Sequence, residues 1–148
     1  MITIRFKRLP HGDGLPLPKR MSVHAAGFDF SAAVDEPINL KPGERTLIPT
    51  GFIVEIPINH ELQIRPRSGL AIKNGISIVN SPGTVDSDYR GEVKIIVINH
   101  SQVTFTINRG DRIAQAVLHK IEPWQTEEVN ELSETERHTG GFGSTGLN

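Results

Sequence analysis

Short runs of alternating apolar and polar residues, separated by glycine and proline, recur along most of this 148-residue chain. A period of two places one face of a segment in a core and is typical of a half-buried β-strand. Alternating runs lie at residues 2–7, 61–65 and 102–107. Residues 45–56 predict a strand, a kink and a second strand, 93–98 is a β-branched run with too few polar positions for an edge strand, and 113–118 is a further strand. Short strands at close spacing favour an all-β fold, a sandwich or barrel of jelly-roll type.

One short helix is expected within this β framework, at residues 68–75. Ser68 is a candidate N-cap and Gly75 a candidate C-terminal stop. The start of a helix offers unpaired N–H groups and a partial positive charge that suit a phosphate, and Arg67 adjoins it. An ordinary capped turn is the alternative interpretation.

Charge and cysteine content exclude several classes of protein. The formal net charge is −1, so no global field would draw the chain to nucleic acid or to a membrane. The absence of cysteine excludes a disulfide framework and a thiolate metal site, and the six histidines are dispersed. No segment approaches a membrane-spanning length, and we expect a cytoplasmic protein without nucleic-acid or membrane partners.

Residues 79–93 contain the most informative stretch of the sequence. Turn residues that include Gly83 stand between two apolar, strand-like runs, which predicts a strand, a tight turn and a second strand. Asn80, Asp86, Asp88 and the chain's only tyrosine, Tyr89, gather on this bend. An amide, carboxylates and a ring could form a small pocket that hydrogen-bonds a base, activates water and lies against a sugar.

The pattern of small and apolar residues at positions 25–33 predicts either a core strand or a short helix. Phe28 and Phe30 share one face, and Asp29 lies on the other. On a core strand, the plain expectation for Asp29 is a solvated carboxylate.

The composition changes after Pro123. Residues 126–136 are rich in glutamate, and residues 137–146 are rich in glycine. Such an end is usually a disordered tail, although its Arg, Phe and hydroxyl groups could make a lid over an anion. We therefore divide the chain into a core, residues 1–125, and a flexible arm, residues 126–148.

Five stretches of the sequence, in this order and spacing, resemble the motifs of the trimeric dUTP pyrophosphatases (dUTPases). They lie at residues 26–30, 66–71, 83–92, 109–115 and 137–146. Phe28 stands where the family often has Tyr, and Val85 where Ile is common. The resemblance implies a jelly-roll subunit, a homotrimer with sites at subunit junctions, an arm that closes over the nucleotide, and Mg²⁺ carried on the triphosphate.

The implied reaction converts dUTP and water to dUMP and pyrophosphate, which keeps uracil out of DNA and supplies dUMP for thymidylate synthesis. Motif position assigns Asp86 as the water-activating acid, although chemistry alone leaves Asp88 as a rival. The resemblance implies that Asp29 holds the water shell of Mg²⁺. It implies substrate contacts at Arg67, Ser68, Gly69, Asn80, Gly83, Val85, Tyr89, Gln115, Arg137, Phe142, Gly143 and Ser144.

Three of these residues are expected to select the substrate. Asn80 would read the uracil edge, Tyr89 would leave no room for a ribose 2′-hydroxyl, and Phe142 would stack on the base. Two alternatives stay open at this point. One is a dCTP deaminase of the same fold, and the other is a non-catalytic jelly-roll module that binds partners through its acidic tail.

Overall fold

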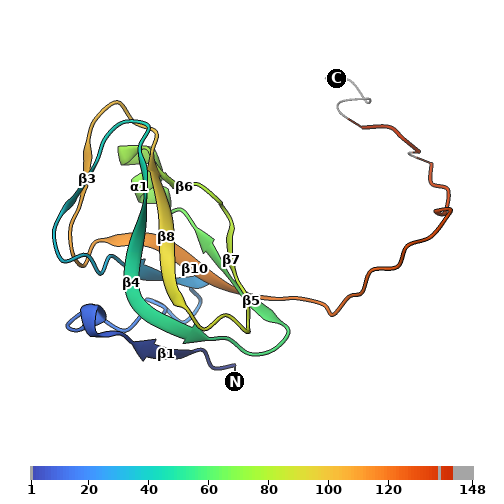
Figure 1. Ribbon diagram of the computed structural model, residues 1–148, viewed down its shortest axis with the longest axis horizontal. Coiled ribbons are helices and arrows are strands. Elements are labelled where there is room, and N and C mark those ends of the chain that lie inside the picture. Colours follow the sequence, from blue (N-terminus) through green and yellow to red (C-terminus); the bar gives the residue numbers. More distant parts are fainter. Residues whose placement is uncertain (1, 137, 142–148) are drawn as a thin grey trace.

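The structure is a computed structural model that describes residues 2–136 and 138–141 (Figure 1). Its strands are β1 (Arg5–Arg8), β2 (Gly27–Ser31), β3 (Ile38–Leu40), β4 (Arg45–Glu55), β5 (His60–Arg65), β6 (Ile76–Ile78), β7 (Gly83–Val85), β8 (Glu92–Asn99), β9 (Phe105–Ile107) and β10 (Arg112–Lys120). Two helical segments complete the secondary structure of the described residues: a 3₁₀ helix, η1 (Pro10–Gly12), and α1 (Ser68–Asn74).

The strands form two antiparallel four-stranded sheets, ordered β1-β4-β8-β6 and β2-β10-β5-β7, and β3 pairs with β9. In Figure 1, β4 and β8 run in front of β10. Apolar residues from both sheets make one continuous core, as alternation along each strand predicts. The expected all-β jelly-roll fold is confirmed.

The predicted strands are found, with shifted ends. The first strand begins at Arg5, three residues later than the alternation suggested, and the run at 102–107 is a strand only from Phe105. The β-branched run at 93–98 lies inside β8, between β4 and β6. Its nearly continuous apolar character fits this interior position, since an edge strand normally carries more polar residues.

The run at residues 45–56, in which Pro49 and Gly51 predict a kink between two strands, forms one bent strand, β4, which ends at Glu55. The register between β4 and β8 shifts between Pro49 and Ile53. Gly51 has a φ of +75°, and a Cβ there would stand 2.4 Å from the Cα of Gly12. Glycine is required on both counts, because this bend brings two backbones together.

A cluster of four phenylalanines joins β1, β2 and β4. Phe6 contacts Phe28 and Phe52 edge-to-face, with ring centroids 5.6 and 5.9 Å apart. Phe28 also packs on Phe30, at 5.5 Å. Residues 25–33 are therefore a core strand and not a helix, since Phe28 and Phe30 are both buried in this cluster.

The predicted helix is present, but its cap differs from the prediction. Gly75 takes the left-handed conformation, with a φ of +64°, and its N–H donates to the carbonyls of Leu70 and Ala71, so the predicted stop is confirmed. The N-cap is Arg67, without a side-chain capping bond, and Ser68 is the first helical residue. The prediction of Ser68 as N-cap was therefore wrong by one position.

The segment at residues 79–91 crosses between the two sheets. As expected, the strands on either side of it, β6 and β8, pair antiparallel. Between them the chain leaves this sheet and forms β7, which pairs with β5 in the opposite sheet. The expected simple strand–turn–strand is therefore wrong, because a third short strand divides the bend.

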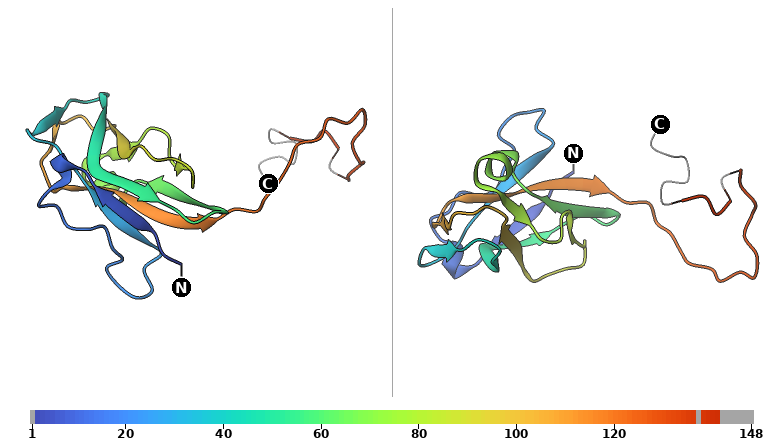
Figure 2. Two further views of the ribbon diagram at one scale, coloured as in Figure 1. Left: turned by 60° about the horizontal axis from the view of Figure 1, so that its bottom comes forward. Right: turned by 90° about the horizontal axis from the view of Figure 1, so that it is seen from above.

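After Lys120, the end of β10, the chain leaves the folded body. Residues 121–136 are exposed and contain no helix or strand. Figure 2 shows this stretch extending away from both sheets. No helix in the described part of the chain is long and apolar enough to cross a membrane.

A fully buried asparagine, Asn99, ties the end of β8 to β3 and to the loop before β9. The Nδ2 of Asn99 donates to the carbonyls of Leu40 and Val103, at 2.9 and 2.8 Å. Its Oδ1 accepts hydrogen bonds from the N–H and the hydroxyl of Ser101, at 2.9 and 2.8 Å. All four hydrogen-bonding positions of the amide are used, so its loss removes the partner of the buried carbonyl of Leu40 and of part-buried groups on Ser101 and Val103.

We expect Asn99→Ala to lower the free energy of unfolding by about 2 to 4 kcal/mol, because the freed carbonyls and Ser101 lose their partners. Urea denaturation at one fixed protein concentration measures the change. Asn108→Ala, at an exposed position, is the matched control and should change stability by less than about 0.5 kcal/mol. Equal effects from the two variants would contradict this account of Asn99.

Candidate active site

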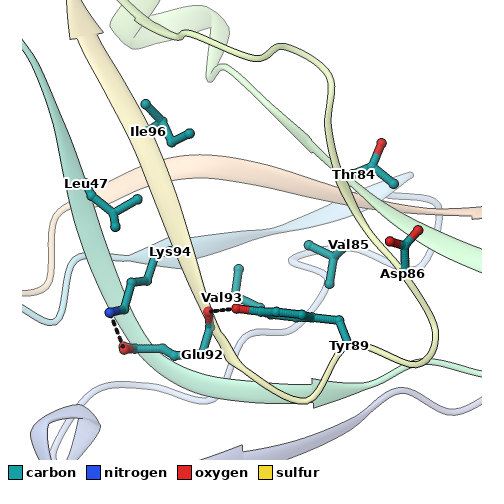
Figure 3. A pocket seen from close by; sticks show the side chains of 9 residues that line it. All are labelled: Leu47, Thr84, Val85, Asp86, Tyr89, Glu92, Val93, Lys94 and Ile96. Atoms are coloured by element: carbon teal, nitrogen blue, oxygen red, sulfur yellow. Dashed lines mark hydrogen bonds and ion pairs between the residues drawn. The ribbon is translucent and has the colours of Figure 1, made fainter.

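Asp86 and Tyr89 line a cavity of about 290 Å³ between β4, β7 and β8 (Figure 3). The cavity is lined by Leu47, Thr84, Val85, Asp86, Tyr89, Glu92, Val93, Lys94 and Ile96. Asp88, the chemical rival of Asp86, is not among these residues. Of these two carboxylates, Asp86 alone is a lining residue of this cavity.

Asp86 follows directly on β7. Val85 is buried, and alternation along the strand turns Asp86 toward the exposed side. The N–H of Tyr89 donates to the backbone carbonyl of Asp86, at 3.2 Å, so a single turn presents the carboxylate and the ring together. Within the described residues, the carboxylate of Asp86 makes no hydrogen bond or ion pair, which leaves it available to a water molecule.

Tyr89 is held by backbone contacts. Its Oη donates to the carbonyl of Glu92, at 3.1 Å, and the residue as a whole is 46% exposed. In Figure 3 the ring lies edge-on beneath Val85 and Val93 and forms one wall of the cavity. A flat, partly exposed ring with a fixed tip is suited to packing against a sugar.

The carboxylate of Glu92 fastens this region to the bend in β4. Its Oε1 accepts the N–H of Gly51, at 2.8 Å, and lies 2.6 Å from Nε2 of His11. The side chain of Glu92 is only 11% exposed. The sequence analysis gave Glu92 no role, because its partners lie 41 and 81 residues away.

A second cavity, of about 250 Å³, contains the residues that were expected to contact phosphate. It is lined by Asp29, Pro66, Arg67, Ser68, Gly69 and Gln115. Strand register explains the grouping, since Gln115 of β10 pairs with Asp29 of β2 on one side and with Arg65 of β5 on the other. Gly69 has open space where a Cβ would stand, so a ligand can approach its backbone.

Asp29 is not the solvated carboxylate that the pattern suggested. Its Oδ2 lies 3.1 Å from Nε of Arg67 and 3.3 Å from Nη1 of Arg112, and its side chain is 17% exposed. Arg67 also donates to the backbone carbonyl of Arg112, at 2.8 Å. One carboxylate thus holds two guanidinium groups at the rim of the second cavity, where they add positive charge.

Asn80 and Gly83 lie close together on the crossing segment. A Cβ on Gly83 would stand 3.1 Å from Nδ2 of Asn80 and 3.4 Å from Cβ of Ile64. Glycine at this position therefore lets the amide of Asn80 fold against β7.

The structure thus gathers eight of the predicted site residues into two groups that share no lining residue, and Asn80 and Gly83 line neither cavity. Asp86, Val85 and Tyr89 belong to the first cavity, and Asp29, Arg67, Ser68, Gly69 and Gln115 to the second. Arg137, Phe142, Gly143 and Ser144 lie outside the described residues. Two residues with a role in these cavities, Arg112 and Glu92, were not predicted from the sequence. For Arg112, the only available signal was its position inside the fourth motif, residues 109–115.

A model of the dUTPase family matches residues 13–146. The deoxyuridine 5′-triphosphate nucleotidohydrolase of Caulobacter vibrioides is 56% identical over 148 residues, which cover 99% of this chain and 96% of that protein. The protein of the same name from Rhizobium johnstonii is 56% identical over 147 residues, covering 98% and 94%.

Solved structures give the same result. A mutant dUTPase of Staphylococcus bacteriophage 80alpha, solved with dUpNHpp, has a TM-score of 0.87 and 26% identity, and the match covers 98% of this chain and 99% of that one. A mutant dUTPase from phage phi11 of S. aureus, described with a structural Mg(II) ion, has a TM-score of 0.79 and 25% identity, with 89% and 99% covered. Together with the fold and the matching motifs, these likenesses show that the chain belongs to the dUTPase family and is a dUTP-hydrolysing enzyme.

Proposed function

We propose that this enzyme forms dUMP and pyrophosphate by attack of water on the α-phosphorus of dUTP, with Asp86 as the base. Water is a poor nucleophile at neutral pH, so a carboxylate must orient it and accept its proton as the new bond forms. The observation that carries this assignment is the unpaired carboxylate of Asp86, which shares a turn and a cavity with Tyr89.

The segment at residues 79–91, which crosses between the two sheets, recognises the nucleoside. The amide of Asn80 and neighbouring main-chain groups read the uracil edge, whose donor and acceptor pattern is reversed in cytosine at position 4. Because Gly83 lies close to Asn80, little space remains beside the base, which disfavours the methyl group of thymine. Val85 lies on the buried side of β7 below the nucleoside, and the exposed ring of Tyr89 packs against the deoxyribose and excludes a 2′-hydroxyl.

The second cavity binds the phosphates. The helical hydrogen bonds of α1 begin with the N–H of Ala71, which donates to Arg67, so the N–H groups of Ser68 and Gly69 have no helical acceptor and can donate to phosphate oxygens. The side chains of Ser68, Gln115 and Arg67 add further donors. Because Asp29 already orients Arg67 and Arg112, the charge that meets the leaving pyrophosphate is placed in advance.

The donor set of the second cavity fits Mg²⁺ bound mainly through the substrate. No group of three or more His, Cys, Asp or Glu side chains in the described residues could hold a metal by itself. Mg²⁺ keeps several waters and commonly binds one carboxylate plus substrate phosphates, where it neutralises developing charge on the leaving group. Since both arginines contact Oδ2 of Asp29, Oδ1 is the oxygen that would hold a metal-bound water.

The two cavities become one active site in a homotrimer, at the junctions between subunits. In a single chain, the residues proposed for water activation and those proposed for phosphate binding line separate cavities. Hydrolysis requires both sets within reach of one triphosphate. Contact between the Asp86 cavity of one subunit and the Ser68 cavity of its neighbour meets this requirement.

Residues 126–148 act as a flexible arm that closes over the bound nucleotide. Residues 121–136 extend from the body without contacts that would bury them, and Arg137, Phe142, Gly143 and Ser144 follow within the last family motif. Arg137 reaches the γ-phosphate and Phe142 stacks on the uracil, while Gly143 and Ser144 offer backbone and hydroxyl donors to the phosphates.

We place this reaction in the cytoplasm, where it keeps uracil out of DNA and supplies dUMP for thymidylate synthesis. The lack of cysteine suits a reducing compartment. Membership of the dUTPase family favours hydrolysis over both alternatives that the sequence left open, the dCTP deaminase and the non-catalytic binding module.

We expect Asp86→Asn to lower turnover of dUTP by roughly 10²- to 10⁴-fold, because the amide cannot accept the proton of the attacking water. Binding of a non-hydrolysable dUTP analogue, measured by calorimetry, should change little. Asp88→Asn is the matched control on the same turn and should keep turnover within about 10-fold of the unsubstituted enzyme. The reverse order of effects would assign the base to Asp88.

We expect subunits with different defects to complement one another. Asp86→Asn and Ser68→Glu subunits, each nearly inactive alone, are mixed 1:1, unfolded and refolded together. If one site takes the two cavities from neighbouring subunits of a trimer, about one quarter of the junctions receive both intact parts. If each site lies within one chain, no intact site forms and activity stays at the level of the separate variants.

A second mixture controls for refolding losses. The unsubstituted chain is mixed 1:1 with the double variant Asp86→Asn/Ser68→Glu. Sites at junctions again predict about one quarter of full activity, whereas sites within chains predict about one half. Sedimentation equilibrium on the same samples checks that the assembly is a trimer.

We expect a chain that ends at Glu136 to remain folded and to lose activity by about 100-fold, because the nucleotide is neither stacked nor closed off from water. Steady-state kinetics measures the loss, and circular dichroism checks the fold. A chain lacking only Leu147 and Asn148, which lie beyond the family match, is the control and should be fully active. Full activity of the shorter chain would show that the arm is a plain tail.

A further inference from the structure

Gly91 lies directly against the ring of Tyr89. A Cβ added to Gly91 would stand 2.2 Å from Oη, 2.4 Å from Cζ and 2.9 Å from Cε2 of Tyr89. These three distances place the added carbon over the face of the ring, above the Cζ–Oη bond. The bare backbone of Gly91 is therefore the surface on which the ring rests.

Backbone conformation does not explain glycine at this position. The φ of Gly91 lies outside the left-handed region, where Gly14, Gly43, Gly51, Gly75 and Gly110 are found. A left-handed φ therefore does not require glycine at this position, and the constraint comes from the ring above it. The constraint is local, since the nearest atoms that a Cβ would meet all belong to Tyr89.

The tip of the ring is also fixed. Oη donates to the carbonyl of Glu92, the residue after Gly91. Glu92 is itself anchored, because its carboxylate accepts the N–H of Gly51 and contacts His11. One face of the ring thus lies on Gly91, and its tip is tied to Glu92. In Figure 3 the ring lies below Val85 and Val93, which line the same cavity as Asp86.

We propose that Gly91 is a positioning residue that sets the depth of the sugar subsite, by letting the ring of Tyr89 lie directly on the backbone. This proposal rests on the proposed contact between Tyr89 and the deoxyribose. A methyl group at residue 91 needs at least 3.4 Å to its neighbours for an ordinary contact, so the ring must rise by about 1 Å, and a displacement of that size costs up to about 100-fold in rate. The cavity becomes shallower, and deoxyribose no longer fits.

The test is a double-mutant cycle on kcat/KM for dUTP. We expect Gly91→Ala to lower kcat/KM by about 10- to 100-fold in the unsubstituted enzyme. In a Tyr89→Ala background, where no ring can be raised, the same change should lower kcat/KM by less than about 3-fold. Equal losses in the two backgrounds would overturn the proposal, since Gly91 would then act independently of Tyr89.

Activity toward UTP separates this proposal from the one on which it rests. Tyr89→Ala should admit UTP, and failure to do so would remove Tyr89 from sugar selection. Gly91→Ala should still exclude UTP, because a raised ring leaves even less room for a 2′-hydroxyl. If Gly91→Ala instead accepts UTP as Tyr89→Ala does, the ring swings out of the site and Gly91 does not set its depth.

Two further measurements guard against a simple folding defect. Ser87→Ala, on the same turn, controls for the effect of an alanine there and should stay within about 3-fold of full activity. If Gly91→Ala alone does not fold, Gly91→Ala/Tyr89→Ala must fold with the stability of Tyr89→Ala, because the overlap is gone. Failure of this rescue would also overturn the proposal.

Discussion

The pairing of β7 with β5 is the interaction on which the candidate active site depends. Only three residue pairs join the strands, from Leu62 opposite Val85 to Ile64 opposite Gly83. This short ladder carries the chain out of one sheet and into the other, and the next residue is Asp86. Since a shift of one residue would exchange the faces of the strand, burial of Val85 also fixes the side on which the carboxylate emerges.

The sequence predicted the faces of the strands better than the path of the chain between them. Alternation placed Phe28 and Phe30 on one face and Asp29 on the other, because a period of two is a local property. The strand β7 was missed because three residues are too few for a period to show, and its partner β5 lies about 20 residues earlier. Pairing of this kind depends on long-range contacts, which local patterns do not encode.

The role of Asp29 shows the same limit at the level of one side chain. Local pattern gives only its outward direction, which suggested solvation. Its actual partners come from two other elements, Arg67 before α1 and Arg112 at the start of β10. These ion pairs join residues 38 and 83 positions apart, so the sequence around Asp29 does not predict them. A contact between residues three or four positions apart would be visible in the local sequence.

Several side chains of the two cavities are already held in place without substrate, whereas the exposed C-terminal stretch is not. Tyr89 is tied to Glu92 and the arginines are tied to Asp29, so neither cavity needs to order these groups when a ligand binds. Residues 121–136 have no such contacts that bury them, and fixing each backbone residue costs about 1 to 2 kcal/mol. Closure of the proposed arm must therefore draw on strong contacts to the triphosphate and the base, so a nucleotide that lacks either would leave the arm open. If the proposed arm closes in this way, specificity resides both in the shape of the cavities and in whether the bound nucleotide can offset the cost of ordering the arm.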